Sequence, residues 1–394
     1  MKVSERLPGI SYGLNRALAG RGVIVKDKAF YNLKPSELQQ KGATSSVGSS
    51  SLPTYIRGKI GAGASEISKA QFTKLLKQVT SHISSISNVF VQDGAVGSSS
   101  KCDAKIRVIS DNPSALLSFS NILWKIPTRA VSHDSCPLTV YVASTISPKT
   151  TEIIGLSSQA NAGFLAADIE HSSLILCGKA FSDTKNVKTT LAALAEPVVS
   201  ARGGLPLSAR LLVSGDSVIL LFAPEDVIKG SSDQLVSADA GVLLSSHGVE
   251  PMFQTRDPSM PSLFKLPSAV ILAIADSSLP SASKLSPGQA AYHFLAGYRK
   301  GKFVPGYIKG PSALDPLDLA KALLSKLEDH KIPAFLINVG EGEKQLAGDE
   351  FVKLVRSTSS KGAPSLEPKD NKLKGKYQRF VSGKFQDLPD EFTF

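Results

Sequence analysis

The sequence of 394 residues contains little cysteine, methionine or tryptophan: 3 cysteines, 3 methionines and 1 tryptophan. Cys102, Cys136 and Cys177 are odd in number and far apart. This argues against a disulfide framework and against a CxxC metal motif, and it favours a reducing compartment inside the cell. The histidines form no HxH or HxxxH pair. The sequence therefore predicts no metal site and no resident cofactor.

Long hydrophobic runs are also missing. The longest, Leu211–Pro224, is interrupted by Ser214–Ser217 and falls short of the roughly 20 apolar residues of a membrane span. The composition, 42% hydrophobic and 20% charged, is ordinary for a globular protein. We expect a soluble intracellular protein with no integral membrane span, long enough for two domains.

The formal net charge is +11, which permits contact with RNA, anionic lipids or acidic proteins. The charge is dispersed, and no known nucleic-acid-binding motif is present. Cationic residues dominate residues 1–30. Two interpretations of this segment stay open, a mitochondrial presequence and a basic N-terminal arm of the mature protein. The cations are Lys2, Arg6, Arg16, Arg21, Lys26 and Lys28, against the acids Glu5 and Asp27.

Short β-branched runs alternate with amphipathic stretches along most of the chain, which is typical of an α/β protein. The clearest helix is Ile67–Val79, with Ser68 as its N-cap. Other expected helices are Pro113–Trp124, Asn186–Ala195, Ala290–Tyr298 and Leu317–Leu327, and the expected strands are Val89–Gly94, Lys105–Ser110, Leu138–Ala143, Leu174–Leu176, Ser217–Phe222, Ser237–Ser245, Val270–Asp276 and Ala334–Val339.

The segment Gly215–Gly230, GDSVILLFAPEDVIKG, has the outline of a phosphate-binding loop, which is a strand, a loop and a lysine. Such a loop works because glycines let backbone N–H groups close around phosphate oxygens. Here the loop instead carries Pro224, which has no N–H, and the carboxylates Glu225 and Asp226. A lysine after a strand is usually a surface lysine, so Lys229 by itself predicts no function.

Several segments taken together resemble the ATP-dependent phosphoenolpyruvate carboxykinase family in order and spacing. The resemblance runs from about Asn32 to the tail, and Tyr292–Leu295 within QAAYHFLAG is its most specific part. It implies a two-domain α/β fold with mixed sheets. We expect a basic arm or presequence over residues 1–30, an N-terminal domain over 31–204, a degenerate nucleotide-binding domain over 205–360 and a C-terminal tail over 361–394.

The resemblance also implies where functional residues should stand, and most positions depart from the family pattern. Lys229 falls on the lysine of the phosphate loop, and Gly230–Ser231 fall where threonines are expected. Ser245–Ser246, before His247–Gly248, replace an acidic metal-binding pair, and Pro206 falls on a metal-ligand histidine. Lys185 or Lys188 is the remaining candidate for the lysine that binds the metal. Arg57 is only a weak match to the arginine of the substrate-binding motif.

These substitutions predict a catalytically inactive carboxykinase-like protein with no catalytic residue, cofactor, metal or small-molecule substrate, and with Lys229 and His247 as relics. We expect it to act as a structural or accessory subunit of a large mitochondrial assembly: respiratory chain, ATP synthase or, with RNA contact, ribosome. The alternative is a divergent enzyme or ligand-binding protein that still uses the ancestral cleft. Its candidate residues are Lys229, Arg57, His247, His293 and Asp276.

Overall fold

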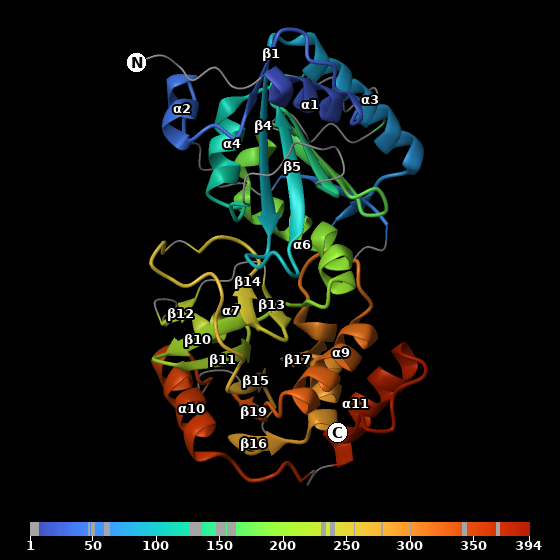
Figure 1. Ribbon diagram of the computed structural model, residues 1–394. Coiled ribbons are helices and arrows are strands. Elements are labelled where there is room, and N and C mark those ends of the chain that lie inside the picture. The colour runs from blue at the N-terminus through green and yellow to red at the C-terminus, as the bar shows by residue number, and fades with distance from the viewer. Residues whose placement is uncertain are drawn as a thin grey trace. The chain divides into compact units, whose positions relative to one another are not determined.

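The computed structural model describes residues 8–45, 48, 52–58, 64–126, 136–146, 155, 163–229, 234–236, 241–255, 257–276, 279–299, 301–340, 345–367 and 371–394. The chain divides into two compact units. Unit 1 comprises residues 1–202 and 310–313, and unit 2 comprises residues 203–309 and 314–394. Each unit is a mixed α/β structure built on its own sheet (Figure 1).

Unit 1 contains an eight-stranded mixed sheet in the order β1-β4-β5-β6-β8-β7-β2-β3. The pairs β4–β5 and β7–β8 are antiparallel and the others are parallel. Its strands are β1 (Lys28–Tyr31), β2 (Thr54–Arg57), β3 (Ser65–Glu66), β4 (Asn88–Val96), β5 (Ala104–Ser110), β6 (Leu138–Ala143), β7 (Gly163–Asp168) and β8 (Ser173–Gly178).

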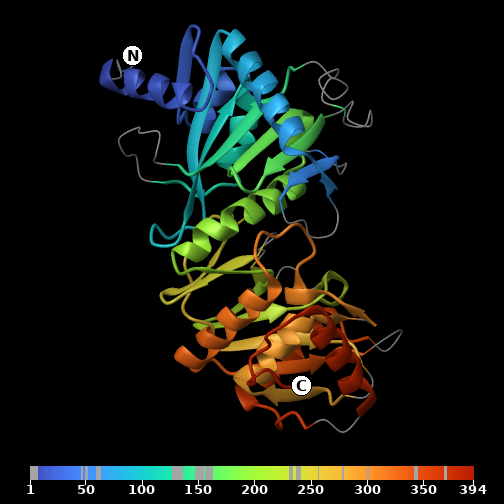
Figure 2. The same cartoon turned by 90° about the vertical axis from the view of Figure 1, so that its right-hand side faces the viewer.

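Helices cover both faces of this sheet, because alternate side chains of its strands are apolar on both sides (Figure 2). Helix α3 packs on one face through Phe72, Leu75 and Val79, which join Val91 and Ile109 in one apolar cluster. Helices α4 and α6 contact strands β4 and β5. The helices of unit 1 are α1 (Pro8–Ala19), α2 (Pro35–Gln40), α3 (Lys69–Ser85), α4 (Pro113–Ser120), the short 3-10 helix η3 (Lys179–Ser182) and α6 (Thr184–Ala201).

Unit 2 contains a six-stranded mixed sheet in the order β12-β10-β11-β15-β19-β16 and a small sheet β14-β13-β9. The central strands β11, β15 and β19 run parallel. The strands are β9 (Leu205–Leu207), β10 (Arg210–Ser214), β11 (Ser217–Phe222), β12 (Leu235–Val236), β13 (Val242–Ser245), β14 (Gly248–Pro251), β15 (Ala269–Ile274), β16 (Ala282–Leu285) and β19 (Ala334–Asn338), with the hairpin β17 (Tyr298–Arg299) and β18 (Lys302–Phe303).

The six-stranded sheet of unit 2 also has an apolar cluster on each face. Leu220, Phe222 and Leu272 point toward helices α8, α9 and α11, whereas Leu221 and Ile271 point toward α7 and α10. The helices are α7 (Glu225–Ile228), α8 (Pro287–Ala296), the 3-10 helix η4 (Pro305–Tyr307), α9 (Pro316–Asp329), α10 (Gly348–Lys361) and α11 (Asn371–Lys384).

Local sequence signals predict most of these elements well. The expected strand Ser217–Phe222 is β11, and the expected helix at Ile67–Val79 is α3, whose N-cap is Ser68 with a capping box to Gln71. The helix at Pro113–Trp124 ends earlier than expected, at Ser120. Residues 237–240 of the expected strand Ser237–Ser245 lie outside the described residues, and the rest is β13.

Two segments differ from the sequence interpretation. Residues 1–30, expected as an arm, contain helix α1 and the start of β1, and the tail contains α11. Leu14, Leu18 and Val23 lie in the core of unit 1, and Phe392 and Phe394 lie in the core of unit 2. These segments are ordered by contacts with distant parts of the chain, which local periodicity does not reveal.

The packing of α1 leads to a stability prediction. Leu18 is fully buried, so Leu18→Ala leaves a cavity in the core of unit 1 and should lower the free energy of unfolding by about 2–5 kcal/mol. Ile24 is 62% exposed, so Ile24→Ala should change it by no more than about 0.5 kcal/mol. Urea unfolding of both variants measures this. Equal, small effects would contradict the placement of α1.

Candidate functional site

The chain after β11 is the position where a phosphate-binding loop would lie. There it forms helix α7, a single turn that follows Pro224. Val227 and Ile228 are buried in the apolar layer that also contains Phe351 of α10. The loop is therefore held as a helical turn by its own side chains, and these pack into the core of unit 2.

The backbone amides of this turn already have acceptors within it. The N–H groups of Val227 and Ile228 donate to the carbonyl of Pro224 at 3.2 and 3.3 Å. The N–H of Lys229 donates to the carbonyl of Glu225 at 2.9 Å. A phosphate-binding loop needs such amides to converge on a ligand, and these three are instead used to close the turn.

A group of cations faces the acidic first turn of α7. Arg210 Nη2 lies 3.7 Å and Lys309 Nζ 3.9 Å from Glu225 Oε1. Burial, followed by repulsion from Arg299 and Arg210, lowers the pKa of Lys309, while Glu225 acts in the opposite direction. Burial also lowers the pKa of Arg299, whose guanidinium carbon lies 4.6 Å from the ring centroid of Tyr307. Cations able to attract an anion are present, and carboxylates of the chain itself lie among them.

Lys229, the proposed relic of the loop lysine, ends α7 as its C-cap and is exposed to solvent. Gly230 and Ser231, expected where threonines would stand, lie outside the described residues. The exposed Lys229 side chain is consistent with an ordinary surface lysine.

Two of the positions expected for metal ligands, Pro206 and Ser245, lie in the small sheet of unit 2. Pro206 in β9 pairs with Leu243 of β13, and Ser245 ends that strand. The Ser245 hydroxyl donates to the Gly248 carbonyl at 3.3 Å and accepts the His247 N–H at 3.2 Å, while the His247 side chain is exposed. In the part of the chain that the structure describes, no cluster of three or more His, Cys, Asp or Glu side chains could hold a metal ion.

Arg57, the weak echo of a substrate-binding arginine, is held by carboxylates of unit 1. Its Nη1 donates to both oxygens of Asp168 at 2.8 Å, and its Nη2 contacts Glu170. These hydrogen bonds raise the pKa of Arg57, with Asp168 the largest contributor. The Asp168 side chain is 4% exposed and also contacts His171 Nδ1 at 2.9 Å. The guanidinium is therefore paired with two carboxylates of the protein itself.

The remaining candidates lie on other elements. Lys185 and Lys188 belong to the first turns of α6 in unit 1, and Lys185 is exposed. Asp276 follows β15 and is half-buried, and its backbone N–H and carbonyl both bond to the Asn338 side chain.

His293 is buried inside α8, with 1% of its surface exposed. Among the described residues, neither of its ring nitrogens has a hydrogen-bond partner. Its ring packs against Tyr377 of α11 and Phe394, with centroid distances of 5.2 and 5.1 Å. This is the environment of a neutral interior histidine that joins α8 to the C-terminal segment.

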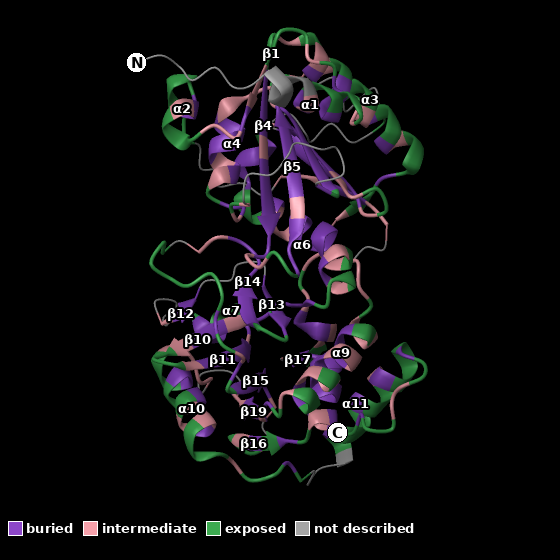
Figure 3. Ribbon diagram, in the orientation of Figure 1, coloured by how far each residue is buried: buried purple, intermediate pink, exposed green. Residues whose placement is uncertain are grey.

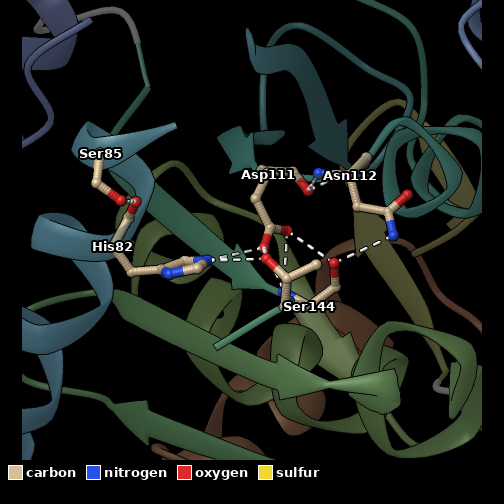
Figure 4. Close-up of polar contacts among 7 residues, drawn as sticks. His82, Ser85, Asp111, Asn112 and Ser144 are labelled. Carbon is tan, nitrogen blue, oxygen red and sulfur yellow. Dashed lines mark hydrogen bonds and ion pairs between the residues drawn. The ribbon is translucent and has the colours of Figure 1, made fainter. Parts of the chain in front are cut away.

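Sequence reasoning missed a polar cluster in unit 1 where β5 and β6 end (Figure 4). Asp111 accepts the backbone N–H and the hydroxyl of Ser144, both at 2.9 Å, and those of Thr145 at 2.9 and 2.8 Å. His82 Nε2 of α3 lies 3.1 Å from Asp111 and 3.0 Å from the Thr145 hydroxyl. Residues so far apart in sequence give no local signal.

This cluster does not have the geometry of a Ser-His-Asp triad. A triad requires one imidazole nitrogen to face the carboxylate and the other to face the nucleophile. Here the same nitrogen of His82 contacts both groups, and the Thr145 hydroxyl donates to the carboxylate. We conclude that the cluster joins α3 to the ends of two strands.

A buried charged pair joins the first strands of unit 1. Arg107 on β5 is fully buried and bonds to both oxygens of Asp93 on β4, at 2.7 and 2.6 Å. The Tyr31 hydroxyl on β1 donates to the same carboxylate at 2.7 Å. Burial and Asp93 raise the pKa of Tyr31. A buried arginine needs such a partner, because an unpaired buried charge is very costly.

Comparison with known proteins agrees with the resemblance seen in the sequence. Residues 58–222 match the family model for phosphoenolpyruvate carboxykinase. The chain is 32% identical over 129 residues to phosphoenolpyruvate carboxykinase (ATP) of Bacillus mycoides strain KBAB4, covering 29% of this chain and 24% of that protein. It is 32% identical over 117 residues to the Bacillus cereus strain B4264 protein, covering 26% and 22%.

The chain therefore resembles the phosphoenolpyruvate carboxykinase family over part of its length, and its mixed α/β architecture is consistent with a fold of that kind. The match spans about a quarter of the length of these relatives. The family match ends at Phe222, the last residue of β11 and directly before the loop that forms α7. Within the described residues, no helix has the length and apolar character needed to cross a membrane.

The burial of His293 leads to a pH prediction. Burial lowers its pKa to about 3, from an ordinary value of 6.5. The unfolded chain takes up a proton as the pH falls through 6.5, but the folded chain does so only near 3, so this residue makes the fold less stable as the pH falls between these values. At pH 4 the loss should be about 3 kcal/mol, because each pKa unit corresponds to about 1.4 kcal/mol.

Replacing this imidazole should remove that pH dependence. His293→Leu should lose less stability than the wild type between pH 7 and pH 4, as measured by urea unfolding at each pH. Tyr292→Phe is the control, since it changes the neighbouring side chain in α8 and keeps His293. An unchanged pH slope in His293→Leu would show that this residue is not buried as a neutral base.

Proposed function

We propose that this protein is a catalytically inactive carboxykinase-like protein that serves as a structural or accessory subunit of a larger assembly. The observation that carries the proposal is the turn after β11. The N–H groups of Val227, Ile228 and Lys229 donate to the carbonyls of Pro224 and Glu225, so they do not converge on a phosphate. Phosphoryl transfer depends almost entirely on positioning and charge stabilisation, and this turn supplies neither.

Electrostatics supports the same proposal. Glu225 and Asp226 stand in the loop, and a nucleotide phosphate would meet their negative charge next to Arg210 and Lys309. In unit 1, Arg57 is bound by Asp168 and Glu170. In both places a carboxylate of the protein lies beside the cation, where an anionic substrate would have to bind.

The metal positions are also poorly suited to a divalent cation. Mg²⁺ and Mn²⁺ prefer carboxylate oxygens. Pro206 offers no side-chain ligand, and the Ser245 hydroxyl is engaged in the turn between β13 and β14. On the proposed function Lys229 and His247 are relics, with no cofactor, metal or small-molecule substrate.

The proposed setting is a mitochondrial complex: respiratory chain, ATP synthase or ribosome. It is supported by the net charge of +11 and by the cationic residues within positions 1–30. Protein subunits are the proposed partners, together with RNA if the complex is a ribosome. On the domain level we propose a carboxykinase-like N-terminal domain and a degenerate nucleotide-binding C-terminal domain.

A nucleotide titration tests the loss of activity. Isothermal calorimetry with ATP and Mg²⁺ or Mn²⁺ should show no binding tighter than about 1 mM for the wild type. Glu225→Gln removes one charge but leaves the amides in the helical turn, so it should also fail to bind. Glu328→Gln, at an exposed position of α9, is the matched control. Micromolar binding by the wild type would overturn the proposal and favour a divergent enzyme or nucleotide-binding protein, with Lys229 the first residue to replace.

Purification under native conditions tests the structural role. From its source in mild detergent, the protein should migrate in a large complex in a fixed ratio to other subunits, as determined by size-exclusion chromatography and mass spectrometry. Migration as a single chain without co-purifying proteins would contradict a subunit role. Subunits recovered with it would also show whether the complex is mitochondrial.

A further inference from the structure

The outer face of helix α11 is cationic and contains no acidic residue. On the opposite, inner face, Leu373, Tyr377 and Val381 are buried against the core of unit 2. Asn371–Lys384 includes no Asp or Glu. Figure 3 shows exposed positions along α11. The cations at exposed positions of this helix are Lys372, Lys374, Lys376, Arg379 and Lys384.

Three of these cations lie along one strip of the helix. Lys372, Lys376 and Arg379 are spaced i, i+4 and i+7, which places them on the same side of an α-helix. Cβ atoms at such spacings lie about 5–6 Å apart. Among the described residues, no carboxylate lies within 4.0 Å of the side-chain nitrogens of Lys376 or Arg379. The positive charge of this pair is therefore not neutralised within the fold.

Two glycines lie on the same exposed side. A Cβ atom added to Gly375 or Gly383 would meet nothing within 4 Å, so packing within the chain does not require glycine at either position. Glycine is one of the poorest helix formers, and an exposed helix position normally favours another residue. Gln378 and Ser382 complete the surface between them. The face is thus positive, polar and open to close approach.

The chemistry of this face favours one class of partner. An amphipathic helix that lies in a membrane interface inserts its apolar side between lipids, and the apolar side of α11 is buried in the protein. Protein interfaces are enriched in aromatic residues and depleted in lysine. Interfaces with nucleic acids are polar and strongly positive, and their affinity comes largely from phosphates.

We propose that the outer face of α11, formed by Lys372, Gly375, Lys376, Arg379, Ser382 and Gly383, binds the phosphate backbone of RNA. Double-stranded RNA is recognised mainly by its shape and its phosphates, because its deep major groove is closed to side chains. The short polar side chains and glycines of α11 suit contact with a backbone and not insertion into a groove. The proposal rests on the charge and shape of α11, and it does not depend on the loss of carboxykinase activity.

A pair of matched charge variants tests this surface in the full-length chain. Fluorescence anisotropy with a labelled RNA duplex of about 16 base pairs gives the affinity at several KCl concentrations. Lys376→Gln with Arg379→Gln should weaken binding about tenfold and make the log–log salt slope shallower by about 2. Lys353→Gln with Arg356→Gln removes the same charges, at the same i, i+3 spacing, from exposed positions of α10, and should retain the wild-type slope.

Three outcomes would overturn the proposal. These are no binding of RNA by the wild type at physiological salt, equal losses in both double variants, and binding of anionic phosphatidylserine vesicles in place of RNA. The nucleotide titration tests the turn after β11 and the RNA assay tests α11, so the result of one does not decide the other.

Gly375 provides a second test that separates binding from folding. Gly375→Gln places a better helix former in open space, so the melting temperature followed by circular dichroism should rise. The same side chain obstructs close approach to α11, so the affinity for the RNA duplex should fall. A raised melting temperature with unchanged RNA affinity would show that RNA does not contact this face.

Discussion

The burial of Val227 and Ile228 between the central sheet of unit 2 and helix α10 is the interaction on which the proposed function depends. It turns the segment after β11 into a helical turn, and that turn uses the amides that a nucleotide would need. Apolar packing decides the geometry here, because moving these two side chains out of the core would expose them to water. The backbone amides then bond to the nearest carbonyls, since buried amides rarely remain without acceptors.

A second regularity concerns charge. In unit 1, Asp168 and Glu170 hold Arg57, and in unit 2, Glu225 lies near Arg210 and Lys309. Cations that could attract an anion are present in both units, with carboxylates of the same chain beside them. Such pairs offset the cost of partly burying the cations, and their net contribution to folding stability is small. The proposed loss of activity rests in part on this pairing of cations with carboxylates of the same chain.

The elements that sequence analysis missed share one physical property. Helix α1 contains Gly9 and Gly13, and α11 contains Gly375 and Gly383, so neither has a strong local signal. Both are ordered by distant contacts: Leu18 packs with the core of unit 1, and Tyr377 with His293. The cluster around Asp111 joins residues separated by 29 to 63 positions, and Arg57 and Asp168 are separated by 111.

The sequence by itself determined the α/β class, the main strands and capped helices, and the composition of the loop after Phe222. These depend on periodicity, capping residues and turn chemistry, which act over a few neighbouring positions. Only the tertiary structure decided that Val227 and Ile228 are core residues and that Arg57 is paired with Asp168. It also decided that His293 packs against Phe394 with no hydrogen-bond partner among the described residues. Each of these depends on which distant side chains the fold brings together, and burial and pairing are properties of that arrangement.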